Sequence, residues 1–160
     1  MADSESVVLA HWYTRLDTFS FSTQEFYERL IAAISHRKIP DLRMSRIALS
    51  EGGLMSHSRD YLRIERGELS FDICAAPFGI DFFVSWWLLD KPGCLSGCVT
   101  VFLPFLGSFF RKTTYYKEDT AIIFREAVHQ AVLETVDEIT KGTGQPFGGN
   151  RVPETRKRLL

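Results

Sequence analysis

Three cysteines and four histidines are the residues of this 160-residue chain that could support nucleophilic or metal chemistry. A cysteine nucleophile needs a base within hydrogen-bond reach, and a structural zinc site needs four ligands. Cys94 and Cys98 have the spacing of one ligand pair, but no second Cys or His pair follows them. Free cysteines such as Cys74 are most often buried as small apolar side chains. The sequence therefore predicts no catalytic residue, no metal site and no cofactor, and it favours a protein that is not an enzyme.

Two carboxylates, those of Asp72 and Asp81, stand in segments that are otherwise apolar. A carboxylate that faces an apolar environment has a raised pKa or an ionic partner, and such groups can serve acid–base chemistry. If Phe71, Ile73 and Ala75 face the interior, however, Asp72 faces outward, because successive strand residues point to opposite faces. We favour this second interpretation, in which Asp72 needs no special explanation.

Basic and aromatic residues are interleaved from His57 to Arg66, a combination found in proteins that bind single-stranded nucleic acid. Asp60 and Glu65 cancel part of that charge, and ion pairs between neighbouring strands would explain the pattern equally well. The whole chain has a formal net charge of -1 and a pI of about 6.4, so it exerts no general attraction on nucleic acid. Nucleic acid is therefore not expected as a partner.

Local signals predict two helices. Ser22 can cap the first helix and Glu25 can complete a capping box, while Phe21 and Phe26 occupy the positions of a hydrophobic staple. Apolar residues then recur at helical spacing, which predicts a helix from about Thr23 to Arg37 with one buried face. The same spacing predicts a second, longer helix from about Asp119 to Lys141, with Gly142 as its end.

A period of two predicts strands in the rest of the first ninety residues. Val7 to Leu16 is rich in strand-forming residues, and three later strands are separated by short turns, which makes them antiparallel neighbours. These three are Tyr61 to Arg66, Glu68 to Ile73 and Asp81 to Leu89, after an alternating segment that begins at Leu42. The fold class predicted is α+β, an antiparallel sheet of about four to six strands with two helices packed on one face. The other face must meet water, a partner or a membrane.

Composition predicts one domain and a tail. Residues 1–142 are expected to form a single α+β domain, and residues 143–160 a flexible basic tail. Four cations and one Glu give this tail a net charge of 4 − 1 = +3. The acidic start of the chain does not have the pattern of a signal peptide, and the odd number of cysteines suits a reducing compartment. We therefore expect a cytoplasmic protein.

The segment from Pro92 to Phe110 contains no charged residue, and 11 of its 19 residues are hydrophobic. A buried core strand from about Cys98 to Leu103 with a following loop is the first interpretation. The second is shallow insertion into a membrane, since three glycines and two prolines interrupt the run too often for a spanning helix. The third is a contact with another protein, because aromatic apolar surface is typical of interface hot spots.

These observations leave three functional hypotheses. The leading one is a non-enzymatic interaction module that binds a protein partner or a second copy through an aromatic strand and the apolar loop. Its contact residues would be Phe82, Phe83, Trp86, Trp87, Phe102, Phe105, Phe109 and Phe110. The second is a peripheral membrane protein, with Arg111 and Lys112 as contacts to anionic head groups. The third is a small-molecule binder or small enzyme with a pocket between sheet and C-terminal helix, near His129 and Tyr115.

Overall fold

The structure is a computed structural model that describes residues 6–50, 58–91, 115–141 and 154–155. Several residues and segments singled out in the sequence lie outside these ranges. They are Cys94, Cys98, the segment Pro92 to Phe110 with its core-strand interpretation, and Phe102, Phe105, Phe109, Phe110, Arg111 and Lys112. The predictions made for them stay predictions.

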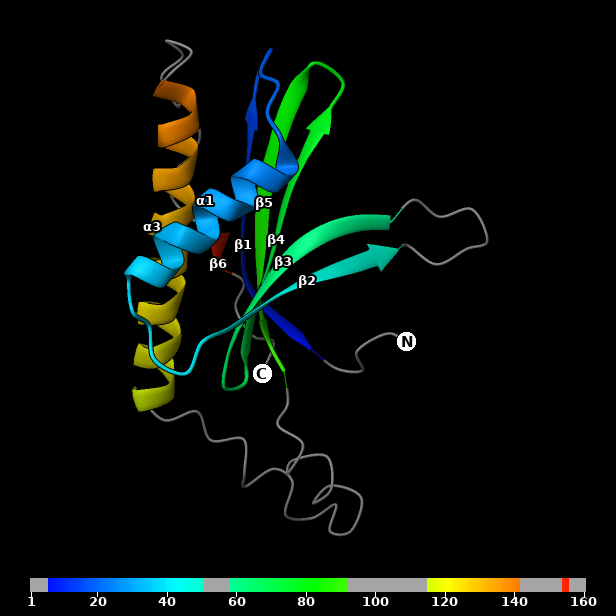
Figure 1. Cartoon of the computed structure of the whole chain (residues 1–160). Helices are drawn as coiled ribbons and strands as arrows, with labels where there is room; N and C mark the ends of the chain where they lie inside the picture. Colours follow the sequence, from blue (N-terminus) through cyan, green and yellow to red (C-terminus); the bar gives the residue numbers. More distant parts are fainter. Residues whose placement is uncertain (1–5, 51–57, 92–114, 142–153, 156–160) are drawn as a thin grey trace.

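An antiparallel sheet and two helices confirm the predicted α+β class. The elements are β1 (Val7–Leu16), α1 (Thr23–His36), β2 (Arg43–Ser50), β3 (Ser58–Arg66), β4 (Leu69–Phe78), β5 (Asp81–Asp90), α3 (Tyr115–Lys141) and β6 (Glu154–Thr155). The strands form one open sheet in the order β2-β3-β4-β5-β1-β6, and all neighbours are antiparallel. Both helices cover the same face of this sheet (Figure 1). We call the opposite side the helix-free face.

The C-terminal helix and the tail differ from expectation. Helix α3 begins at Tyr115, four residues before the predicted Asp119, and ends at Lys141 as predicted. Residues 154 and 155, which the sequence placed in a flexible tail, form the short strand β6 and pair with Ala10 and His11 of β1. Two residues carry too little periodicity to be recognised as a strand before the pairing is known.

Helix α1 forms where the local signals place it. The Ser22 hydroxyl accepts a hydrogen bond from the Glu25 amide at 3.3 Å, as expected of an N-cap. The helix ends at His36, one residue before the predicted Arg37, and Lys38 follows in the left-handed region with φ 49°. Its buried residues lie on one side and face the sheet: Phe26, Tyr27, Leu30 and Ile34.

The core lies between this helix layer and the sheet. Trp12 pairs with Trp86, Trp86 pairs with Ile73, and Ile73 pairs with Leu62, which makes one cross-sheet line of apolar side chains. All four are at most 2% exposed. Because cross-strand neighbours point to the same face, the register of the sheet fixes this line against the helices.

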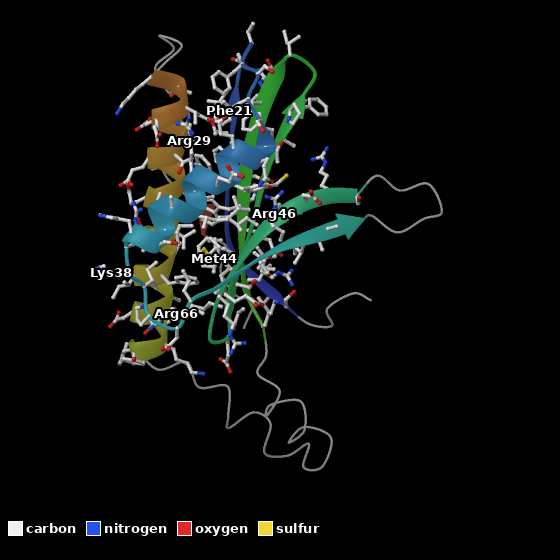
Figure 2. The ribbon with its side chains drawn as sticks, viewed as in Figure 1. Phe21, Arg29, Lys38, Met44, Arg46 and Arg66 are labelled. Carbon is white, nitrogen blue, oxygen red and sulfur yellow. The ribbon has the colours of Figure 1, made fainter. Side chains whose placement is uncertain are left out.

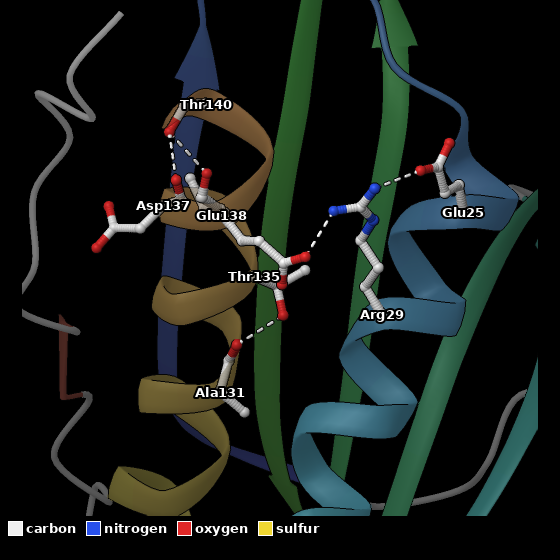
Figure 3. A network of polar contacts seen from close by, with 8 residues as sticks. Glu25, Arg29, Ala131, Thr135, Asp137, Glu138 and Thr140 are labelled. Atoms are coloured by element: carbon white, nitrogen blue, oxygen red, sulfur yellow. Dashed lines mark hydrogen bonds and ion pairs between the residues drawn. The ribbon is translucent and has the colours of Figure 1, made fainter. Parts of the chain in front are cut away.

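Ion pairs at the surface join the two helices (Figure 3). One Arg29 guanidinium nitrogen contacts Glu138 of α3 and another contacts Glu25 of α1, both at 2.6 Å. These side chains are 36% or more exposed, so the pairs add only a small amount to stability. The buried hydroxyls of Thr135 and Thr140 donate to carbonyls four residues earlier in α3. They therefore need no partner from the sheet.

The sheet divides between β3 and β4, and we call this point the fork. The two strands pair from Arg66 and Leu69 as far as Tyr61 and Cys74. Beyond that point β3 continues to pair with β2, and β4 with β5, while the two halves of the sheet diverge (Figure 1).

The hydroxyl of Tyr27 occupies the fork. It accepts a hydrogen bond from the Ala75 amide at 2.9 Å, and it lies 2.8 Å from the carbonyl oxygen of Asp60 and 3.2 Å from that of Ile73. One phenol on α1 thus contacts backbone groups of both β3 and β4 where the ladder between them ends. Tyr27 is fully buried, and burial raises the pKa of its hydroxyl above the ordinary value.

Arg46 of β2, which is labelled in Figure 2, contacts Tyr27 and Gln24 of α1 and Asp60 of β3 beside the fork. The carbon of its guanidinium lies 4.1 Å from the centre of the Tyr27 ring, a cation–π contact. The same guanidinium lies 3.7 Å from the Asp60 carboxylate and 3.2 Å from the side-chain oxygen of Gln24. The position of α1 and the direction of the β2–β3 hairpin are therefore linked through one aromatic ring.

We expect Tyr27→Phe to lower the free energy of unfolding by about 1–3 kcal/mol, because it leaves the buried Ala75 amide without an acceptor. Urea unfolding followed by circular dichroism measures this change. Tyr13→Phe is the matched control, because Tyr13 is 57% exposed, and it should change the free energy by less than about 0.5 kcal/mol. Equal effects of the two variants would contradict the role given to Tyr27.

The stability of wild type and of Tyr27→Phe should also depend differently on pH in the alkaline range. Since the pKa of Tyr27 is higher in the folded state than in the unfolded state, the neutral phenol contributes stability that is lost as the pH rises above about 10. Wild type should therefore lose stability more steeply than Tyr27→Phe across that range. Parallel curves for the two proteins would show that the Tyr27 hydroxyl does not titrate differently on folding.

Candidate functional site

Strand alternation divides the four aromatic residues predicted as a contact surface on β5. Phe82 and Trp86 are 0% exposed and pack under the helices, so the prediction that they form a contact surface is wrong. Phe83 and Trp87 lie on the helix-free face and are half-buried. Consecutive residues of a strand cannot share a face, and this splits each aromatic pair between the core and the other side.

Four rings from β1 and β5 form a continuous row on the helix-free face, which we call the aromatic row (His11, Tyr13, Phe83 and Trp87). The His11 ring stacks on Trp87 with centroids 3.9 Å apart and on Tyr13 at 5.7 Å. Tyr13 in turn stacks on Phe83 at 6.2 Å. Tyr13 is 57% exposed, so the row presents aromatic surface to the outside.

The two members on β1 were not singled out from the sequence, although a signal for them exists. In Val7–Leu16 the buried residues Ala10, Trp12 and Thr14 alternate with His11 and Tyr13. If alternate residues of β1 had been assigned to opposite faces of the sheet, as was possible for β5, His11 and Tyr13 would have been placed on the same face as Phe83 and Trp87. The pairing of β1 with β5 was not predicted, and it joins strands far apart in the sequence.

The middle of the helix-free face is polar and buried. Asp72 faces away from the helices, as favoured from the sequence, but it is only 4% exposed, and the expectation that it needs no explanation is wrong. Arg63 of β3 holds it through two hydrogen bonds of 2.7 and 2.8 Å, one to each carboxylate oxygen. Such bidentate pairs are strong and directional, and breaking one by removing a partner leaves a buried charge. Ion pairs between neighbouring strands were one explanation considered for the basic residues of this segment, and Arg63 forms such a pair with Asp72.

A thiol and a phenol stand next to this ion pair. Cys74 is 1% exposed and pairs in register with Tyr61 of β3. Burial raises the pKa of the Cys74 thiol and of the Tyr61 hydroxyl. For the thiol, the nearby positive charge of Arg59 and hydrogen bonds from Tyr61 and Arg59 act in the opposite direction and are weaker. The thiol is therefore held in its protonated, poorly nucleophilic form at neutral pH.

Two exposed cations lie on the same face of the sheet, on β2 and β3, whereas the aromatic row is on β5 and β1. Arg43 and Arg59 are exposed, and neither forms an ion pair with an acidic residue in the described part of the chain. Of the acids on this face, Asp72 pairs with Arg63 and Glu65 pairs with Lys91 at 2.9 Å. The described part of the helix-free face therefore carries exposed aromatic rings on β1 and β5 and two exposed cations without an ion pair on β2 and β3.

The two residues suggested for a pocket are not brought together. His129 is 1% exposed, and its Nδ1 accepts a hydrogen bond of 3.1 Å from the indole N–H of Trp86. Tyr115 is 92% exposed and lies 14 positions earlier in α3, which corresponds to about 21 Å along the helix. His129 is thus part of the core between α3 and the sheet, where its ring also contacts Trp12 at 5.2 Å.

Asp81, the second carboxylate noted in the sequence, has a structural role. One of its oxygens accepts a hydrogen bond of 2.9 Å from the Thr18 amide, and the other lies 3.7 Å from Arg15. Thr18 has a φ of 50°, a strained value for a β-branched residue, in the connection between β1 and α1. Asp81 therefore holds this connection to the β4–β5 turn.

Two kinds of feature are absent from the described residues. Residues 6–50, 58–91, 115–141 and 154–155 contain no group of three or more His, Cys, Asp or Glu side chains arranged to hold a metal ion. Within the same ranges, neither helix is long and apolar enough to cross a bilayer.

Removal of one partner of the buried ion pair should be costly. We expect Asp72→Ala to lower the free energy of unfolding by about 3 kcal/mol, because the largely buried Arg63 guanidinium loses the carboxylate that holds it in a bidentate pair. The double variant Arg63→Met with Asp72→Leu should recover most of that loss in urea unfolding. Glu68→Ala, which breaks the exposed pair with Lys117, serves as the control and should cost less than about 1 kcal/mol. A double variant as unstable as Asp72→Ala would contradict this assignment.

Comparisons with known proteins give no relative from which a role could be transferred. No family model, no curated protein and no solved structure matches the chain. Any function must therefore be inferred from the residues themselves, and within the described ranges the helix-free face is the surface that carries both the aromatic row and two exposed cations without an ion pair.

Proposed function

We propose that this chain is a non-enzymatic interaction module that binds an acidic surface of a protein partner on its helix-free face. The observation that carries the proposal is the aromatic row, with Tyr13 57% exposed in the middle of a strand. Aromatic side chains and Arg dominate the binding energy of protein interfaces, where they bury a large area at low entropic cost.

The geometry of the row supports a rigid contact. Each ring is held by its neighbours, and His11, Tyr13 and Phe83 come from two paired strands, so little freedom is lost on binding. The Arg63–Asp72 pair fixes the strands beneath the face by linking β3 to β4. A surface ordered in advance binds a partner more tightly than a flexible one of equal area.

The charges on the face favour an acidic partner over a second copy of the chain. Two identical faces would each bring Arg43 and Arg59 into the contact, and like charges oppose association. An acidic partner would instead be attracted, and rim charges of this kind act mainly on the association rate. Self-association, considered from the sequence, is therefore the less favoured version of this proposal.

The non-enzymatic part of the proposal rests on the chemistry of the same face. Its nucleophile candidate, Cys74, is buried, and its pKa is raised by burial. Its buried carboxylate, Asp72, is held by Arg63 in a bidentate pair. The thiol is therefore a poor nucleophile near neutral pH, and the carboxylate is occupied by the Arg63 guanidinium.

Site-specific photo-crosslinking in cells tests this proposal. Benzoylphenylalanine in place of Tyr13 should give an adduct with one partner, at about fivefold or more the yield obtained at Ile80, a residue of the β4–β5 turn that is more exposed than Tyr13. Adding Arg59→Glu should reduce the adduct at position 13, because it reverses a charge that attracts the partner.

Two results would contradict the proposal. Equal adduct yields at positions 13 and 80 would mean that the aromatic row is not the contact surface. An adduct with the mass of two copies would replace the acidic partner by the chain itself, and light scattering on the purified wild type would then show a dimer that Tyr13→Asp dissociates.

A further inference from the structure

Strand β2 forms one edge of the sheet. It lies outermost in the order β2-β3-β4-β5-β1-β6, and within the described residues it pairs with β3 alone. In an antiparallel strand every second residue points its N–H and C=O toward the neighbouring strand, and the residues between point them away. Every second residue of Arg43–Ser50 therefore directs its backbone groups outward, where no strand of the described fold pairs with them. We call this row of backbone groups the β2 edge.

The opposite edge of the sheet is different, because the chain closes part of it. The two residues of β6 pair with Ala10 and His11 of β1, and β1 has an irregular register between Val8 and Ala10. The β2 edge has no comparable device within the described residues. Its eight residues pair with β3 without a shift of register, and β2 contains no proline. Long and regular edges of this kind are the ones on which a further strand can form.

The β2–β3 hairpin presents this edge away from the helix layer. Beyond the fork, β2 and β3 extend away from both helices (Figure 1). Arg46 holds the hairpin in that direction through its contacts with the Tyr27 ring and the Asp60 carboxylate. An edge that is already fixed in the extended form loses little conformational freedom when a strand is added.

The side chains of β2 are apolar, basic or small, and none is acidic. Arg43, Ile47 and Leu49 point to the helix-free face, and Leu49 is 43% exposed. Arg46 points to the opposite side. Arg43 lies opposite Glu65 in the register, but the Glu65 carboxylate pairs with another cation, and Arg43 forms no ion pair within the described part of the chain. The edge therefore offers positive charge together with exposed apolar surface.

The two arginines determine which strand suits the β2 edge. A symmetric pairing of two β2 strands would bring both copies of each arginine together, and like charges near each other across a sheet are destabilising. Acidic side chains opposite Arg43 and Arg46 would instead be attracted, and apolar side chains opposite Ile47 and Leu49 would add cross-strand contacts. The charges therefore favour an acidic extended segment over a second copy of the chain.

We propose that the β2 edge binds an acidic extended segment of a partner protein, which adds to the sheet as a strand antiparallel to β2. In its own N- to C-terminal direction, this segment carries apolar residues opposite Leu49 and Ile47 and acidic residues opposite Arg46 and Arg43. Its motif is an apolar residue, any residue, an apolar residue, an acid, any two residues and an acid. The contact uses the edge of the sheet and not the helix-free face, so it does not depend on the function proposed above.

Selection of short random peptides displayed on phage, with the full-length protein as target, tests this motif. The selected peptides should carry it. A synthetic peptide with the motif should bind at least about tenfold more tightly than the same peptide with lysine in place of both acids, as measured by fluorescence anisotropy.

Leu49 and Val7 provide a matched pair of variants for the same peptide. Leu49→Glu should weaken binding about tenfold, because it removes an apolar contact and places a negative charge beside an acidic strand. Val7→Glu should leave binding unchanged, because Val7 is 44% exposed, close to the 43% of Leu49, but belongs to β1. Both side chains are exposed, so both variants are expected to keep the fold, which circular dichroism verifies.

Amide hydrogen exchange distinguishes strand addition from other contacts. When the peptide binds wild type, the outward-pointing amides of β2 should exchange about tenfold more slowly or less. The amides between them, which donate to β3, should change little. Protection of every second residue along one strand is the signature of backbone pairing.

Four results would overturn the proposal. Selection that yields no peptide, or peptides without the motif, would mean that the β2 edge does not recognise an acidic strand. Equal binding losses in Leu49→Glu and Val7→Glu would place the contact elsewhere. Binding without alternating protection would make it a contact of side chains only. Peptide-free wild type that forms a dimer dissociated by Leu49→Glu would make a second copy the occupant of the edge.

Discussion

The structure depends on one buried hydroxyl, that of Tyr27. Where β3 and β4 separate, backbone groups of both strands lose their ladder partners, and buried groups of this kind are costly when unpaired. Tyr27 meets the Ala75 amide and the Asp60 and Ile73 carbonyls from α1, within 3.2 Å in every case. A sheet can divide at this point only because a helix supplies the missing partner.

The two faces of the sheet follow from this arrangement. Because Tyr27 and Arg46 tie α1 to the fork, the helix layer is fixed on one side and the apolar line through Trp86 is buried there. In each strand, the residues between the core residues point to the helix-free face. This is why that face carries both the aromatic row and the buried Arg63–Asp72 pair. The candidate contact surface therefore follows from the alternation of side chains along the strands and from the face of the sheet that α1 covers.

The sequence predicted the parts of the fold that rest on short-range signals. Ser22 and the apolar spacing behind it located α1 to within one residue at its C-terminal end, and β1 was located at both ends. The burial of Asp72 and the hydrogen bonds of Tyr27 depend on partners in other strands or in another element, so neither could be predicted without the register. On β5, two of the four residues predicted as contact surface are buried instead. Both faces of this strand carry apolar residues, so the sequence shows no alternation that would separate Phe82 from Phe83.

Amide hydrogen exchange at Ala75 tests the central claim most directly. If the Tyr27 hydroxyl is the acceptor that holds the fork, the Ala75 amide is protected in wild type and exchanges at least about tenfold faster in Tyr27→Phe. The amide of Ile73, which lies inside the β3–β4 ladder, should keep its protection relative to the global stability of each protein. Unchanged protection of Ala75 in the variant would mean that the fork is held by something other than Tyr27 and would contradict this account.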